Sequence, residues 1–229
     1  MSNLLPDRLR SACLPIWQSL AEHPFLRELA AGTLPEEKFR FYIEQNLMYL
    51  PEYSRAIAVG AAMSRDEGQL QGFAASLSNI VAVEIPENEA RLAEVIELGA
   101  ADHGGSLEMS PANLAYTSYL TSAAFRGGPL DVITVLMPCA WSYGEIACGL
   151  DLSGNDHPVY CKWVSFFAGD EYSQIVERMK GQMEEYARIS PASEDHLVEL
   201  FKNGARLELG FWEMAYTLER WPDVSPRTS

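Results

Sequence analysis

The stretch that decides the fold is Thr-Leu-Pro-Glu-Glu-Lys-Phe-Arg-Phe-Tyr-Ile-Glu-Gln-Asn-Leu-Met-Tyr-Leu-Pro, residues 33–51. Its apolar side chains recur three or four positions apart, the spacing that places them on one face of an α-helix. Thr33 followed by Glu36 matches a capping box, with Thr33 as N-cap, and predicts the start of that helix. Because proline lacks a backbone N–H, we expect Pro51 to kink or end the helix.

The same spacing continues along the chain on both sides of this stretch. It predicts helices over residues 67–98 with a break near Pro86, 129–149, near 158–167, 170–189, and from Ser193 to about Trp221. Ser110-Pro111 is a further helix start, and Gly127-Gly128 ends that helix. No stretch shows the sustained alternation of a strand, and no linker or repeat divides the chain. The prediction is an all-α fold, one helical bundle domain over residues 1–229.

Charge and composition limit the classes of function. The formal net charge is −15, which repels phosphate backbones and anionic lipids, so we expect no nucleic acid and no membrane as partner. No basic segment followed by an apolar stretch opens the chain, and no apolar run approaches the roughly 20 residues that span a bilayer, so cytoplasm is the expected location. The four cysteines form no Cys-x-x-Cys pair, which favours free thiols over a zinc site.

The first candidate for chemistry is Cys139. It follows Pro138 and lies four residues before Tyr143, so the thiol and the phenol share a helix face. A helical turn interrupted by proline leaves N–H groups unpaired, and such groups would favour a thiolate. The alternative is a buried structural cysteine beside a packed tyrosine.

The second candidate is Glu208, in a largely apolar segment. Glu208 and Trp212 lie four residues apart on one helix face. If that face is buried, desolvation raises the pKa of the carboxyl group, as a general acid requires. The alternative is an amphipathic helix on which Glu208 and Glu213 both face water.

The third candidate is a polar stripe in the opening stretch. Tyr42, Asn46 and Tyr49 lie at positions i, i+4 and i+7, where the rings can stack on a flat heterocycle while the amide binds its edge. The alternative is a set of core residues with satisfied hydroxyl groups. Tyr116 and Tyr160 add aromatic rings in segments that by themselves are ordinary core patterning.

These segments together resemble the TenA family, also called thiaminase II or aminopyrimidine aminohydrolase. The shared motifs, in order along the chain, are His23-Pro24-Phe25, Gly32-Thr33-Leu34-Pro35 with Phe39, Tyr42 and Gln45, Ser110-Pro111 with Tyr116-Thr117-Ser118, Leu136-Met137-Pro138-Cys139, His157-Pro158-Val159-Tyr160 with Lys162-Trp163, and Phe211-Trp212 with Met214-Ala215-Tyr216.

The resemblance implies a haem-oxygenase-like bundle without haem, a homotetramer, and hydrolysis of the C–N bond at the methylene of a 4-amino-2-methylpyrimidine or of thiamin. It implies that Cys139 is the nucleophile and Glu208 the acid/base at a ring nitrogen. The tyrosines that match its pocket are Tyr49, Tyr116, Tyr143 and Tyr160. No metal or other cofactor is implied.

One position departs from the family pattern. Asn46 stands where the family usually has an aspartate that binds the 4-amino group. An amide can donate to a ring nitrogen and accept from the amino group, as asparagine does with adenine, but it supplies no charge. The expectation is therefore a C–N hydrolase. The alternatives are a binding or regulatory protein in which Asn46 weakens the family reaction, and a hydrolase of another nitrogen heterocycle.

Overall fold

The computed structural model describes residues 4–101 and 107–222, and these residues form eleven α-helices and one π-helix with no strand. The helices are α1 (Leu5–Ala12), α2 (Leu14–Ala21), α3 (Pro24–Ala30), α4 (Glu36–Ala62), α5 (Glu67–Asn79), the π-helix η1 (Ile80–Glu84), α6 (Ile85–Glu97), α7 (Pro111–Arg126), α8 (Pro129–Gly149), α9 (Pro158–Phe167), α10 (Asp170–Ile189) and α11 (Glu194–Thr217). The predicted all-α class is confirmed.

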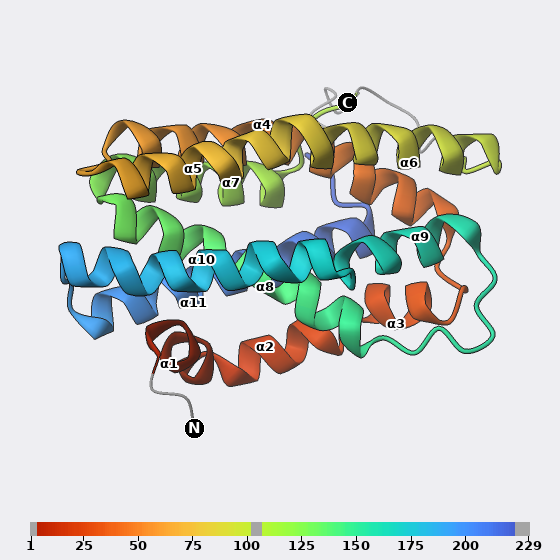
Figure 1. Cartoon of the computed structure of the whole chain (residues 1–229). Coiled ribbons are helices and arrows are strands. Elements are labelled where there is room, and N and C mark those ends of the chain that lie inside the picture. The colour runs from red at the N-terminus through yellow and green to blue at the C-terminus, as the bar shows by residue number, and fades with distance from the viewer. Residues whose placement is uncertain (1–3, 102–106, 223–229) are drawn as a thin grey trace, which may run out of the picture.

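The long helices lie side by side as a bundle. α5, η1 and α6 form one rod along the top of Figure 1, and α4 packs against all three and against α7. α8 packs against α10, α11 and α7, while the short helices α1 to α3 lie along the bottom of the view. One apolar cluster runs through the bundle from Leu5 to Ala215. The helices that surround its centre are the ones that carry the candidate residues.

Several predicted helix starts are confirmed. The Ser110 side chain accepts a hydrogen bond from the Asn113 N–H, and Ser193 does the same for His196. At the N-cap, a side-chain oxygen accepts a hydrogen bond from a backbone N–H that has no acceptor within the helix. This bond fixes where the helix begins.

The capping box predicted at Thr33 is wrong. α4 begins at Glu36 after Pro35, which makes no side-chain cap. The N–H of Thr33 instead donates to the Glu28 carbonyl oxygen at 2.9 Å, and Gly32 has a φ of 70°. A left-handed glycine with such a bond is the usual end of a helix, so Thr33 closes α3 rather than opening α4.

Proline acts differently at two positions. α4 continues through Pro51 to Ala62, because its packing against the neighbouring helices outweighs the loss of one helical hydrogen bond. Near Pro86 the predicted break is a π-helix, Ile80–Glu84, directly before α6. The last helix ends at Thr217, before the predicted Trp221.

One helix among the described residues, α8, is long and apolar enough to cross a membrane, contrary to the expectation that no apolar run comes close. Of its most apolar window, 72% is buried inside the protein, as in the central helix of a folded bundle. α8 therefore serves as the core helix that holds Cys139.

Candidate functional site

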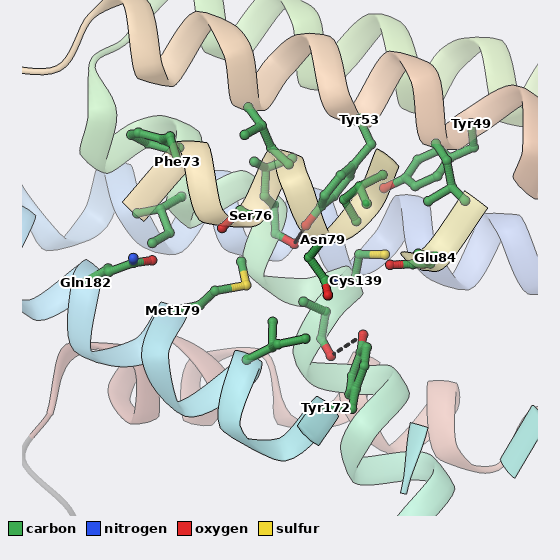
Figure 2. A pocket seen from close by; sticks show the side chains of 17 residues that line it. Tyr49, Tyr53, Phe73, Ser76, Asn79, Glu84, Cys139, Tyr172, Met179 and Gln182 are labelled. Atoms are coloured by element: carbon green, nitrogen blue, oxygen red, sulfur yellow. Dashed lines mark hydrogen bonds between the residues drawn. The ribbon is translucent and has the colours of Figure 1, made fainter. Parts of the chain in front are cut away.

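A cavity lies at the centre of the bundle, between α4, the α5–η1 rod, α8 and α10 (Figure 2). Tyr49 and Tyr53 come from α4, Cys139 from α8, Tyr172 from α10, and Glu84 from the π-helix. Of the residues predicted from sequence, Tyr49 and Cys139 line this cavity. The others lie behind its wall or outside it.

Cys139 is half-buried, and it lies among the lining residues of the cavity. Burial, and then the negative charges of Glu208 and Glu84, raise the pKa of the thiol well above its ordinary value. The idea that the proline-interrupted turn favours a resting thiolate is therefore wrong. A Cys139 nucleophile needs a base to remove its proton.

Glu208 in α11 is buried, with only 1% of its surface exposed. Of the two sequence interpretations, this is the one in which its helix face is buried. The Tyr116 hydroxyl donates to its Oε2 at 2.9 Å. Burial raises the pKa of the carboxyl group to about 7, although hydrogen bonds with Tyr116, Cys139 and Tyr143 lower it in part. Near neutral pH such a group can both give and take a proton. Glu213, in contrast, is exposed and contacts His23.

Tyr49 places a hydroxyl without a well-formed hydrogen bond in this region. Its ring lies 5.0 Å from that of Tyr116 and 5.5 Å from that of Phe211, centroid to centroid. Its buried hydroxyl makes no well-formed hydrogen bond to a described residue, although it lies close enough to Tyr116 and Cys139 to lower the pKa of both in part. A buried polar group without a partner costs free energy, so this hydroxyl is available to a ligand in the cavity.

Tyr143 lies beside Glu208 rather than on the cavity wall. The indole N–H of Trp163 donates to the Tyr42 hydroxyl at 3.2 Å, and Tyr42 donates to Tyr143 at 3.2 Å. Tyr143 in turn helps to stabilise the Glu208 carboxylate. These three side chains therefore orient the acid/base candidate from within the core.

Asn46 is buried, and its amide is already occupied. Its Nδ2 donates to Oδ1 of Asn88 at 3.2 Å, and Nδ2 of Asn88 donates to the backbone oxygen of Glu84 at 2.8 Å. The amide thus links α4 to the end of the π-helix and does not line the cavity.

Tyr160 lies apart from the other candidates. Its hydroxyl donates to the Leu34 carbonyl oxygen at 2.8 Å, and its ring packs against His157 and Phe39. It is absent from the cavity lining. The structure gives it the contacts of a core residue that fixes the start of α4 to α9.

Sequence reasoning missed three residues of the cavity. Tyr53 donates to the Leu136 carbonyl oxygen at 3.3 Å, and Tyr172 donates to that of Ala140 at 3.0 Å, so they hold α8 on either side of Cys139. Glu84 was also missed, although a lone acid within Ile80-Val81-Ala82-Val83-Glu84-Ile85 is a usable signal. Among the described residues, no group of three or more His, Cys, Asp or Glu could hold a metal ion.

The bundle defines the class of protein, and the comparisons place the chain within it. A solved domain with a heme oxygenase-like fold from Shewanella denitrificans superposes with a TM-score of 0.70 at 15% identity, over 95% of this chain and 94% of that one, which shows the fold alone. The model of the TENA/THI-4/PQQC family matches residues 10–218. The chain belongs to that family.

Individual relatives agree over nearly the whole length. The aminopyrimidine aminohydrolase of Halalkalibacterium halodurans is 34% identical over 213 residues, which are 90% of this chain and 93% of that protein. The aminopyrimidine aminohydrolase of Bacillus subtilis is 28% identical, over 95% of this chain and 92% of that protein. A solved TenA homologue from P. horikoshii has a TM-score of 0.83 at 31% identity, over 93% and 99% of the two chains.

Proposed function

We propose that this protein is an aminopyrimidine aminohydrolase of the thiaminase II type, a hydrolase that acts on C–N bonds in thiamin metabolism. The observation that supports it most directly is a thiol, Cys139, beside a buried carboxyl group, Glu208, whose pKa is about 7. The same activity is named for relatives that are 28% and 34% identical over most of the chain.

Glu208 acts as the acid at the ring. With a pKa near 7 it retains its proton in a large share of molecules at neutral pH, and it donates that proton to a pyrimidine nitrogen. Protonation withdraws electrons from the ring and makes its carbons electrophilic. Tyr116, Tyr143 and the residues behind them keep the carboxyl group oriented.

Cys139 acts as the nucleophile. Its sulfur forms a bond to a ring carbon, and the electron pair released by the adduct expels the amine from the exocyclic methylene. Water then adds at that methylene, and the ring–sulfur bond breaks to return the thiol. The net reaction exchanges the amine, or the thiazolium of thiamin, for a hydroxyl group.

Two further residues serve the ring in this proposal. Tyr49 supplies a hydroxyl that makes no well-formed hydrogen bond, and a stacking face, to the bound pyrimidine. Asn46 serves indirectly, through Asn88, unless substrate binding frees its amide. No part is assigned to Tyr160.

The experiment is hydrolysis of 4-amino-5-aminomethyl-2-methylpyrimidine, with thiamin assayed in parallel. Wild type should release the amine, and Cys139→Ser and Glu208→Gln should each lose most of the turnover. Cys148→Ser is the matched control, because Cys148 is an exposed thiol on the same helix and should be silent. Turnover retained by Cys139→Ser would exclude covalent catalysis by this thiol. Absence of turnover in wild type, with tight binding of the pyrimidine alcohol, would favour a binding protein.

We further infer one domain, a homotetramer and a cytoplasmic location. Apolar side chains are exposed along the α5–η1–α6 rod, among them Leu70, Val81, Val83 and Ile96, as expected where subunits pack. The cysteines in the described residues are free thiols, which a reducing compartment preserves. Light scattering after gel filtration tests the tetramer: a monomer mass would refute it.

A further inference from the structure

We propose that Glu84 is a second carboxyl group of this site, which takes the proton from the Cys139 thiol and later passes it to the departing amine. The inference rests on the proposed hydrolase function. It adds a base that the resemblance and the sequence motifs did not identify.

Glu84 and Cys139 line the same cavity from opposite elements. Glu84 is the last residue of the π-helix, and Figure 2 shows its carboxyl group directed to the cavity beside the sulfur of Cys139. Among the described residues that line the cavity, Glu84 carries the one carboxyl group. Glu208 approaches Cys139 from α11 instead, so the thiol lies between two carboxyl groups.

The burial pattern around Glu84 is the reverse of an ordinary amphipathic helix. Val81 is 54% exposed and Val83 is 42% exposed, while the next residue, Glu84, is half-buried and lines the cavity. Moving a carboxyl group out of water costs free energy. An apolar residue at this position would avoid that cost. π-helical turns also occur frequently at functional sites. The inward glutamate therefore serves a purpose other than packing.

A hydrogen-bonded chain supports the turn that carries Glu84. The Asn88 amide donates to the Glu84 backbone oxygen at 2.8 Å, and Asn46 donates to Asn88 at 3.2 Å. Both amides are buried. Asn46 thus acts as a positioning residue for the carboxyl group, since an amide cannot itself accept a proton at neutral pH.

The groups around Glu84 suit a base. Its titratable neighbours are Arg91 on α6, Cys139 on α8, Tyr42 and Tyr53 on α4 and Tyr172 on α10. Burial raises the pKa of Glu84 to about 7, and the positive charge of Arg91 lowers it in part. A carboxyl group with this pKa is ionised in a useful share of molecules at pH 7.

The proton steps balance with two carboxyl groups. The ionised Glu84 takes the proton of the Cys139 thiol as sulfur bonds to the ring, while Glu208 gives its proton to the ring nitrogen. Glu84 then donates its proton to the amine as the methylene–nitrogen bond breaks. When water adds to the methylene, Glu84 takes the proton of that water and gives it to the thiolate released from the ring, while the ring nitrogen returns its proton to Glu208. In this scheme the acid at the ring, Glu208, and the base at sulfur, Glu84, are separate groups.

The test compares Glu84→Gln with wild type in two measurements, using Glu89→Gln, an exposed glutamate on α6, as the matched control. Loss of a general base should lower kcat by about 100-fold with KM within about threefold, and should remove the acidic limb of the pH–kcat profile. Glu84→Asp should recover part of the rate. For Glu84→Ala, added formate should restore turnover.

The second measurement is the rate at which iodoacetamide alkylates Cys139 at pH 8, followed by peptide mass spectrometry. Removing the neighbouring anion should lower the pKa of the thiol, so alkylation should become faster in Glu84→Gln although turnover becomes slower. A merely structural Glu84 would give no rescue by formate and no change in the acidic limb. Unchanged alkylation would refute the proximity of Glu84 to the thiol. If wild type itself shows no turnover, the proposed function fails first, and the base with it.

Discussion

Replacing Glu208 by glutamine should stabilise the protein at alkaline pH while it removes the acid/base. The carboxyl group is 1% exposed, and its pKa is about 7 against an ordinary value of 4.5. Between these two values the folded protein binds a proton that the unfolded chain does not. Stability from this group is therefore fully present below pH 4.5 and is lost as the pH rises toward 7.

The size of the effect follows from the two pKa values. A difference of about 2.5 pKa units at 1.36 kcal/mol per unit corresponds to about 3 kcal/mol at pH 8. Glutamine avoids this cost, because it is neutral at every pH and its oxygen can accept the Tyr116 hydrogen bond. For a chain of 229 residues, about 3 kcal/mol raises Tm by roughly 6–12 °C.

The assay is thermal unfolding of wild type and Glu208→Gln at pH 5 and pH 8. The variant should melt well above wild type at pH 8 and close to it at pH 5. Glu213→Gln removes the same charge from an exposed position on α11, so it should change Tm little at both pH values. A Glu208→Gln variant that is less stable than wild type at pH 8 would mean that the carboxylate is satisfied in the folded state, and the reasoning about its acidity would fail.

Three further predictions concern single contacts. Tyr116→Phe removes a hydrogen bond that favours the carboxylate, so the pKa of Glu208 should rise further. The alkaline limb of the pH–rate profile should then move upward by roughly one unit. A downward shift would contradict this prediction. Asn46→Asp places a carboxylate against Oδ1 of Asn88, so the free energy of unfolding measured in urea should fall by about 1–3 kcal/mol, with no gain in turnover. A faster enzyme would restore the view that Asn46 merely weakens the reaction. Tyr160→Phe removes one buried hydrogen bond and should cost about 1 kcal/mol with kcat/KM unchanged; a raised KM would return Tyr160 to the pocket.

Sequence rules predicted the starts and ends of helices well where neighbouring residues determine them. The cap at Ser110 and the bounds of α8 and α10 depend on nearby residues, and the structure confirms them. The rules were less decisive where packing determines the outcome. Pro51 was expected to kink or end its helix, and α4 does not end there, because contacts with neighbouring helices compensate for a missing hydrogen bond.

The candidate site residues divide in the same way, because local sequence predicts some of their features and packing decides the others. The burial of Glu208 was one of two sequence interpretations, and the structure decides for it because α11 packs its apolar face against α8. Tyr160 and Tyr49 look alike in sequence, yet the Tyr160 hydroxyl is paired with a backbone carbonyl, while the Tyr49 hydroxyl makes no well-formed hydrogen bond to a described residue. Which tyrosine faces the cavity depends on helix rotation, which is a tertiary property.

Glu84 shows why a site residue that stands out in the sequence can still be hard to place in the structure. Its direction depends on the π-helix, which changes the helical register between α5 and α6, and on the Asn46–Asn88 link from α4. An α-helical reading of the Ile80–Ile85 run gives no reason for a glutamate to face inward. The position that departs from the family pattern, Asn46, and the unassigned acid, Glu84, are thus parts of one hydrogen-bonded arrangement. In that arrangement a neutral amide holds the turn, and the charge next to the thiol comes from the turn itself.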